Sequence, residues 1–171
     1  MKNIIFTIIT FLIIHSGYSQ IFKDKKLISY DGFFKFYYEE SQDKIFLEVT
    51  ELDKEFLYIN SLASGVGSND IGLDRGQLGS KRLVKFTKAG NKLLLIQPNQ
   101  NYRAITNNEN ERKSVEQAFA KSVLYGFKIL EHKEGKYVID ITSFLMEDAH
   151  GVASLLQRKN EGNYKIDLIF Y

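Results

Sequence analysis

Apolar and polar residues alternate over several short stretches of this chain, which is typical of β-strands. Residues 44–50 (KIFLEVT) alternate in this way, and the aromatic-rich residues 32–40 (GFFKFYYEE) precede them. The four residues in between, 40–43, are of types that favour turns. We therefore predict a β-hairpin here, followed by a third strand over residues 55–62 (EFLYINSL).

A second hairpin is predicted in the middle of the chain. Residues 81–88 (KRLVKFTK) and 92–97 (KLLLIQ) are separated by Ala-Gly-Asn at 89–91. Glycine and asparagine adopt positive φ easily, which a tight hairpin turn needs. Pro98 has no N–H to give to a ladder, so we expect the second strand to end before it.

The period changes to that of a helix over residues 107–123. Asn107 or Asn108 can cap the helix, and the acidic residues that follow suit the positive end of its dipole. Charged residues occupy the opposite face. The helical spacing is carried by Val115, Ala118, Phe119, Ser122 and Val123.

The remaining elements complete the prediction of an α+β fold. A third hairpin is expected from residues 124–131 and 136–141, and a last strand over 164–170. Between them we expect a second helical stretch that Thr142 or Ser143 caps and that runs through 148–158. Together these elements predict a mostly antiparallel β-sheet or open barrel of about seven strands, with one or two helices packed on it.

The N-terminus has the pattern of a secretory signal peptide. Lys2 provides a positive charge, residues 4–14 are almost all apolar, and the small residues Gly17 and Ser19 precede a cleavage site at Gln20. The apolar run is shorter than the roughly 20 residues that a membrane-spanning helix needs.

Cleavage of residues 1–19 predicts an exported protein, periplasmic or secreted, with no membrane association afterwards. Residues 20–171 have the length of a single domain, beginning with a polar, loosely structured lead over 20–29. The chain has no cysteine, which excludes disulfides and thiolate chemistry. A net charge of +2 gives no argument for a nucleic-acid partner.

The long connection over residues 62–80 (LASGVGSNDIGLDRGQLGS) holds five of the twelve glycines. Its acidic and amide side chains match neither an EF-hand nor an RTX calcium loop, and turns stabilised by these side chains are favoured instead. We expect an ordered loop whose candidate structural or interface residues are Asn69, Asp70, Asp74 and Arg75. Substitution of Asp74 or Arg75 by alanine is expected to reduce stability or docking.

The sequence contains no recognisable catalytic motif. His132 and His150 do not have the spacing of HExxH, and no GxSxG elbow occurs. We therefore predict no catalytic, cofactor-binding or metal-binding residue in this chain. One alternative is that His150 contributes a ligand to a metal site built elsewhere. Another is that the aromatic residues 32–40 form a sugar- or peptide-binding platform, although core packing is favoured.

Several motifs occur in an order that resembles one protein family. The motifs are GFFKFYYEE, EFLYINSLASGVGSNDIGLDRGQLGSKRLVKF, LLIQPNQNYRA, ERKSVEQAFAKSVLYGFKI and DITSFLMEDAHGVASLL, with SNDIGLDRGQLG the most specific. Over residues 30–167 the chain resembles the N-terminal region of large secreted zinc-dependent metalloproteases of Gram-negative bacteria. In that family this region is a domain of unknown function that precedes a metzincin-like catalytic domain with an HExxHxxGxxH-type motif.

The resemblance implies a non-catalytic module that packs on or supports a catalytic domain absent from this chain. Zinc is expected only in that missing domain, and the domain is the expected partner, in cis or as a separate chain. The chain is then a truncated reading frame, a fragment or one piece of a split gene, and inactive as a protease alone. The alternative function is a free-standing secreted module that binds a ligand or protein through residues 62–80.

Overall fold

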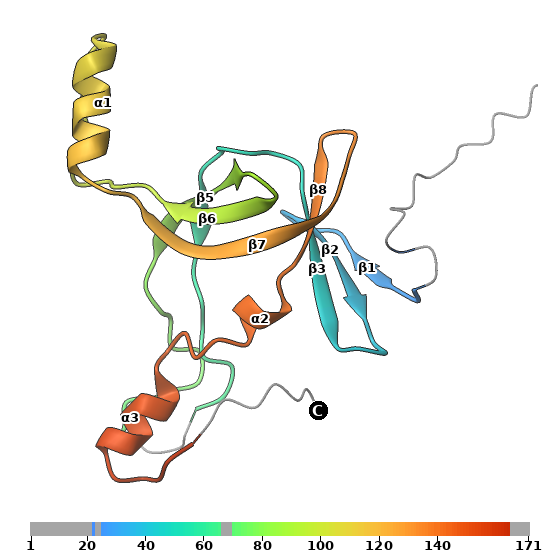
Figure 1. Cartoon of the computed structure of the whole chain (residues 1–171). Coiled ribbons are helices and arrows are strands. Elements are labelled where there is room, and N and C mark those ends of the chain that lie inside the picture. Colours follow the sequence, from blue (N-terminus) through green and yellow to red (C-terminus); the bar gives the residue numbers. More distant parts are fainter. Residues whose placement is uncertain (1–21, 23–24, 66–69, 165–171) are drawn as a thin grey trace, which may run out of the picture.

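The chain folds around one antiparallel sheet of eight strands that curves into a half-barrel (Figure 1). The computed structural model describes residue 22 and residues 25–65 and 70–164. Along the sheet the strands follow the order β1-β2-β3-β8-β7-β6-β5-β4. Their bounds are Ile28–Tyr30 (β1), Lys35–Glu39 (β2), Lys44–Val49 (β3), Phe56–Tyr58 (β4), Arg82–Ala89 (β5), Lys92–Gln97 (β6), Ser122–Lys133 (β7) and Lys136–Asp140 (β8).

The predicted α+β class and antiparallel sheet are confirmed, and so are the three hairpins β2–β3, β5–β6 and β7–β8. Their turns have the left-handed residues that hairpins require: Gly90 has φ +59°, and Glu134 and Gly135 have φ +52° and +77°. The sheet has eight strands instead of about seven. The additional strand is β1, which pairs with β2 and begins at Ile28, near the end of the lead predicted to be loose over 20–29.

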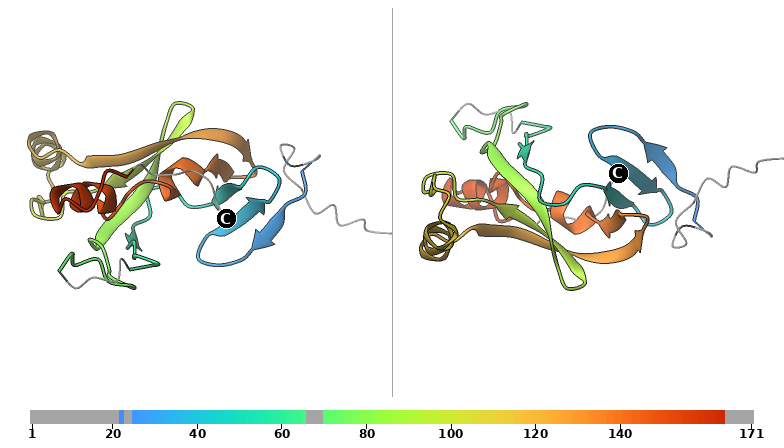
Figure 2. Two further views of the ribbon diagram at one scale, coloured as in Figure 1. Left: turned by 90° about the horizontal axis from the view of Figure 1, so that it is seen from below. Right: turned by 90° about the horizontal axis from the view of Figure 1, so that it is seen from above.

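Strand β7 joins the two halves of the half-barrel. Its first half pairs with β6 and its second half with β8, with a register shift between Ile129 and Glu131. Such a bulge increases the bend of a strand. Near the middle, a Cβ at Gly126 would lie 3.3 Å from a methyl of Leu94, so a side chain there would crowd β6. The views in Figure 2 show β7 running along the length of the molecule.

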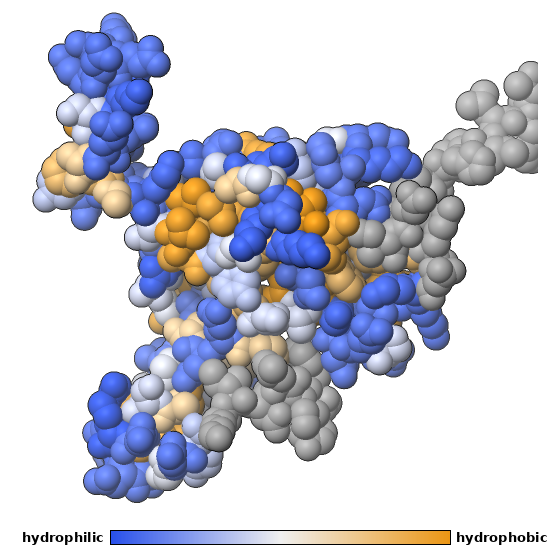
Figure 3. Space-filling model, viewed as in Figure 1, coloured by the Kyte–Doolittle hydropathy of each residue, from blue (hydrophilic) through white to orange (hydrophobic). Residues whose placement is uncertain are grey.

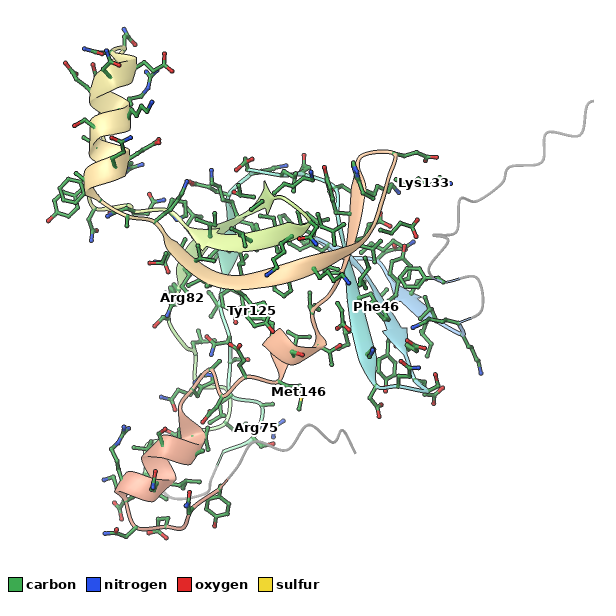
Figure 4. The ribbon with its side chains drawn as sticks, in the orientation of Figure 1. Phe46, Arg75, Arg82, Tyr125, Lys133 and Met146 are labelled. Carbon is green, nitrogen blue, oxygen red and sulfur yellow. The ribbon has the colours of Figure 1, made fainter. Side chains whose placement is uncertain are left out.

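The main core fills the concave side of the sheet. Phe144 of the short helix α2 (Thr142–Leu145) packs there against Tyr125 and Phe127 of β7, at ring-centroid distances of 5.3 and 5.6 Å. Tyr125 accordingly lies between β7 and α2 (Figure 4). The buried members of this core are Val49, Val84, Phe86, Leu93, Leu95, Phe127 and Ile139.

A second, smaller cluster lies on the opposite side of the sheet. Phe22 packs there against Phe46 of β3 and Val138 of β8. The same N-terminal segment places the Lys25 ammonium 2.7 Å from the buried Glu39 carboxylate. The segment that was predicted to be loose therefore covers a sheet face and neutralises a buried charge.

The aromatic residues of 32–40 are divided between these surfaces. Phe34 packs in the main core against Phe56, Tyr37 contributes to the second cluster, and Phe36 stacks on Tyr30 with centroids 4.8 Å apart. The side chains of Phe34 and Tyr37 therefore pack in the two clusters, as the sequence favoured over a binding platform.

The helices differ most from the prediction. The predicted helix over 107–123 is shorter, because α1 spans Glu109–Ala118 and the chain continues as β7 from Ser122. No residue of α1 is buried, and the helix projects from the sheet (Figure 1). Of the one or two helices expected to pack on the sheet, α2 packs there through Phe144 and α1 does not.

The helical stretch predicted from a cap at Thr142 or Ser143 through 148–158 is confirmed in part, as two separate helices, α2 and α3 (Val152–Arg158). The predicted cap is wrong, because Thr142 and Ser143 lie within α2 and Ile141 occupies its N-cap position. The predicted signal peptide and nearly all of the strand expected over 164–170 lie outside the described residues. Within the residues that the structure describes, no helix is long and apolar enough to cross a membrane.

Candidate functional site

The helix α1 is stabilised at its ends by local contacts. The Asn108 side chain accepts a hydrogen bond from the backbone N–H of Asn110, as predicted for a cap, and Glu109 and Glu111 occupy the first turn. At the other end the Phe119 N–H donates to the Val115 carbonyl. Only Val115 within α1 is partly shielded from solvent, so the helix has no apolar face that packs on its own domain.

The base of α1 is fixed to the segment that precedes it. The rings of Phe119 and Tyr102 stack with centroids 4.0 Å apart and planes within 8° of parallel. The Arg112 guanidinium donates to the Thr106 carbonyl at 2.9 Å. Backbone N–H groups, including that of Tyr102, donate to the Asn99 side chain and hold this segment in a turn.

A cavity of about 590 Å³ opens between α1, residues 98–104 and the neighbouring strands. Its walls combine apolar groups with an excess of positive charge. Apolar surface comes from Ile96, Val115 and the Tyr102–Phe119 stack. The charged side chains of the lining are Lys85, Arg103, Arg112, Lys113, Lys121, Glu55 and Glu116.

One of these cations is neutralised at the cavity edge. The Lys85 ammonium lies 3.2 Å from the Asp53 carboxylate, which also accepts a hydrogen bond of 2.7 Å from the Thr87 hydroxyl. This hydrogen bond is the main reason why the pKa of Asp53 is lowered, and the positive charges of Lys85 and Lys121 add to it. Asp53 thus holds the connection between β3 and β4 against β5, where its own N–H donates to the Phe86 carbonyl.

The segments that flank α1 expose large apolar side chains. Ile105 is fully exposed, and Tyr102, Phe119 and Val123 are exposed by 38 to 55%. Figure 3 shows apolar side chains at the base of α1. Exposed apolar groups that gather around a projecting helix are typical of an interaction surface.

The predicted candidate residues of the 62–80 loop lie elsewhere. Asn69 falls outside the described residues, and Asp70, Asp74 and Arg75 are all exposed. Figure 4 shows Arg75 far from the α1 side of the sheet. In the described part of the chain, the side chains of Asp70, Asp74 and Arg75 make no hydrogen bond or ion pair, so the structure does not bring them together as a site.

Backbone contacts hold this loop instead. Leu62 donates to the Gln77 carbonyl at 2.9 Å and accepts from the Gly76 N–H at 2.7 Å. Leu73 is buried. A Cβ on Gly65 would lie 2.8 Å from the backbone nitrogen of Arg75. The two arms of the loop therefore approach this closely only because residue 65 is glycine.

His150 lies just before α3. Its Nε2 atom is buried and has no hydrogen-bond partner among the described residues. The neighbouring Asp148 carboxylate is occupied at the start of α3, since it accepts from the N–H groups of Val152 and Ala153. In the described ranges no group of three or more His, Cys, Asp or Glu side chains is placed to hold a metal ion.

The tyrosines with altered acidity lie in the sheet region. Burial raises the pKa of Tyr58, whose ring packs near Phe144. A hydrogen bond to Asp43 raises the pKa of Tyr38. Both shifts keep the phenols protonated at neutral pH, so neither tyrosine is activated as a base or nucleophile.

The α1 cavity was not predicted from the sequence. Its cations are scattered between residues 85 and 121, and they come together only through the topology. One signal was available: within 109–118 (ENERKSVEQA), Val115 and Ala118 are the apolar residues. A helix with so little apolar surface is not a strong candidate for packing on a sheet.

Comparison with protein families divides the chain in two. Residues 15–65 match a domain of unknown function, DUF5118, and residues 76–168 match another, DUF5117. No curated protein and no solved structure matches the chain.

The two matched segments contribute to one sheet. The first supplies β1 to β4 and the second β5 to β8, yet β3 pairs with β8 and β4 pairs with β5. The N-terminal segment therefore provides both edges of the sheet. Because the second match spans more than half of the 171 residues, the chain belongs to the DUF5117 family of domains of unknown function.

Proposed function

We propose that this chain is the non-catalytic N-terminal module of a secreted zinc-dependent metalloprotease and that it packs on the protease's catalytic domain. The observation that carries the proposal is the unpartnered helix α1 with exposed apolar side chains at its base. The choice of partner rests on the resemblance of the motifs over residues 30–167. Zinc and proteolysis then belong to the partner domain.

Physical reasoning supports an interface at α1. A ten-residue helix is only marginally stable without tertiary contacts, and α1 receives few from its own sheet. Ile105, which is fully exposed, gains nothing from its position in the isolated chain. A second surface that covers α1 and its flanks would stabilise the helix and remove these apolar groups from water.

Isothermal titration calorimetry with a catalytic domain tests the proposal. The catalytic domain is taken from a secreted zinc-dependent metalloprotease of the family that the motifs over residues 30–167 resemble. We expect one-to-one binding with a dissociation constant of about 1 µM or lower. Absence of heat and of co-elution at about 100 µM of each protein, roughly a hundred times that constant, would contradict the proposal.

Two matched variants locate the interface. Ile105→Ser removes a fully exposed apolar side chain beside α1, and Leu78→Ser removes an exposed one in the 62–80 loop. Neither side chain is buried, so both variants should fold like the wild type. We expect Ile105→Ser to weaken binding about fivefold or more and Leu78→Ser to leave it unchanged.

A further inference from the structure

We propose that the groove between α1 and residues 98–104 binds an acidic segment of the partner protein that also carries an aromatic or aliphatic side chain. The inference rests on the proposed function and deepens it, because it names the part of the partner that α1 receives. The groove is the cavity of about 590 Å³ described above. This volume lies in the range of pockets that hold small ligands or a few side chains.

The charge of the groove favours an acidic occupant. Five cationic side chains and two carboxylates line it, which leaves an excess of three positive charges. Lys85 is paired with Asp53. Arg103 and Lys113 make no hydrogen bond or ion pair with any residue that the structure describes, and both are exposed. Their charges are therefore available to carboxylates of a partner.

The apolar part of the groove favours a segment with a large side chain. The stacked rings of Tyr102 and Phe119 form a flat wall, and Val115 is the one partly shielded residue of α1. An aromatic or aliphatic side chain placed against this wall would bury apolar area on both partners. The carboxylates on either side of it could then reach Arg103 and Lys113.

A protein segment fits this lining better than a nucleic acid does. Glu55 and Glu116 share the groove with the cations, and carboxylates repel a continuous row of phosphates. The net charge of the whole chain, +2, is also too small for a surface that follows a phosphate backbone.

Fluorescence anisotropy with labelled peptides tests the proposal on the full chain. The probes are EEFEEFEE, its neutral counterpart QQFQQFQQ, and a single-stranded oligonucleotide of eight nucleotides. We expect the acidic peptide to bind at least about tenfold more tightly than the neutral peptide. We also expect its affinity to fall with added salt, because exposed charge pairs are screened.

The variant Arg103→Gln/Lys113→Gln removes two groove cations that make no hydrogen bond or ion pair with the described residues. Its matched control is Arg158→Gln/Lys159→Gln, which removes one exposed arginine and one exposed lysine at the end of α3, away from α1 (Figure 1). We expect the groove variant to bind the acidic peptide about tenfold more weakly, because it loses two partly exposed charge pairs with the peptide. The control should bind the peptide like the wild type.

A charge reversal sharpens this result. In Arg103→Glu/Lys113→Glu the acidic peptide should be rejected, and the basic peptide KKFKKFKK should bind instead. Circular dichroism of each variant checks that folding is retained. Equal loss of binding in the groove and control variants, or tighter binding of the oligonucleotide than of the acidic peptide, would overturn the proposal.

The outcome can be separated from that of the proposed function. If the groove variant binds the catalytic domain as tightly as the wild type, the groove is not the docking site, whereas the proposed function stands. If wild-type chain binds the acidic peptide but no catalytic domain, the groove assignment stands and the proposed partner is wrong.

Discussion

The interior of the half-barrel and the surroundings of α1 are both rich in aromatic side chains, but they use them differently. In the interior, Phe127 is 2% exposed and its ring contacts those of Phe86, Tyr125 and Phe144. Beside α1, Phe119 is 38% exposed and contacts the ring of Tyr102. The same type of residue is thus a core element in one region and a surface element in the other.

This difference indicates what each region contributes. Burial of an aromatic side chain in the half-barrel stabilises the domain by removing apolar area from water. The aromatic pair beside α1 leaves much of its area in water, so its contribution to the stability of the isolated chain is small. This contrast supports the proposal that a partner covers the α1 region.

The largest expected effect comes from truncation in the interior. Phe127→Ala should reduce the free energy of unfolding by about 3–5 kcal/mol, because it removes a buried ring and leaves a cavity. Phe119→Ala is the matched control and should cost less than about 1 kcal/mol, the value of a partly exposed aromatic pair. Urea denaturation measures both. Similar losses in the two variants would break the contrast between the regions.

The next largest effect is expected in the 62–80 loop. Gly65→Ala places a Cβ 2.8 Å from the backbone nitrogen of Arg75, so the two arms of the loop must separate. We expect a loss of about 1–3 kcal/mol, the usual cost of overpacking, and faster hydrogen exchange at Leu62 and Gly76. Ser64→Ala is the control, because Ser64 is exposed. Unchanged exchange in Gly65→Ala would show that the loop does not depend on this close approach.

A smaller effect depends on pH. The hydrogen bond from Thr87, with help from Lys85, lowers the pKa of Asp53 below its ordinary value of 3.8. Because the pKa of Asp53 is lower in the folded than in the unfolded chain, its ionised carboxylate stabilises the fold at pH values above the unfolded-state pKa. This stabilisation is lost as the pH falls through the folded-state pKa. Asp53→Asn should therefore cost about 0.5–1 kcal/mol at neutral pH, since the ion pair is largely exposed, and less in acid.

Denaturation of both proteins at a series of pH values checks this prediction. Asparagine tolerates the left-handed backbone of residue 53, whose φ is +58°, so the variant tests the charge alone. A stability difference that grows below pH 3.8 would contradict the assignment.

The smallest effect is expected at the exposed side chains of the 62–80 loop. Asp74→Ala and Arg75→Ala should change the free energy of unfolding by no more than about 0.5 kcal/mol, because neither side chain has a partner in the described residues. The same two variants in the titration with the catalytic domain test the expectation that this loop takes part in docking. A large loss of stability would show that these side chains anchor the loop.

The fold was predictable where local chemistry determines it. The turn glycines Gly90 and Gly135 locate two hairpins, and Asn108 locates the start of α1. The end of α1 was misplaced because Ser122 and Val123, the first residues of β7, continue the apolar spacing of the helix by coincidence. Strand β1 was missed because three exposed residues after the lysine-rich residues 23–26 are too few to establish a period.

The candidate site could not be predicted from the sequence, and the reason differs from that for α1 and β1. Arg103 and Lys113 stand in segments with no recognisable motif, and Lys85 comes from a separate hairpin. Their proximity depends on how β5, β6 and the flanks of α1 are arranged, which is a property of the tertiary structure. The glycine-rich loop, which is conspicuous in the sequence, is held mainly by backbone hydrogen bonds.

Hydrogen–deuterium exchange at α1, with and without the metalloprotease catalytic domain, tests the central claim most directly. In the free chain we expect the amides of Glu109–Ala118 to exchange far faster than those of β7, because α1 lacks tertiary burial. On addition of the catalytic domain, the α1 amides should become strongly protected while those of β7 change little. Protection of α1 equal to that of β7 in the free chain, or α1 amides that stay unprotected in the complex, would contradict the claim that this helix serves docking.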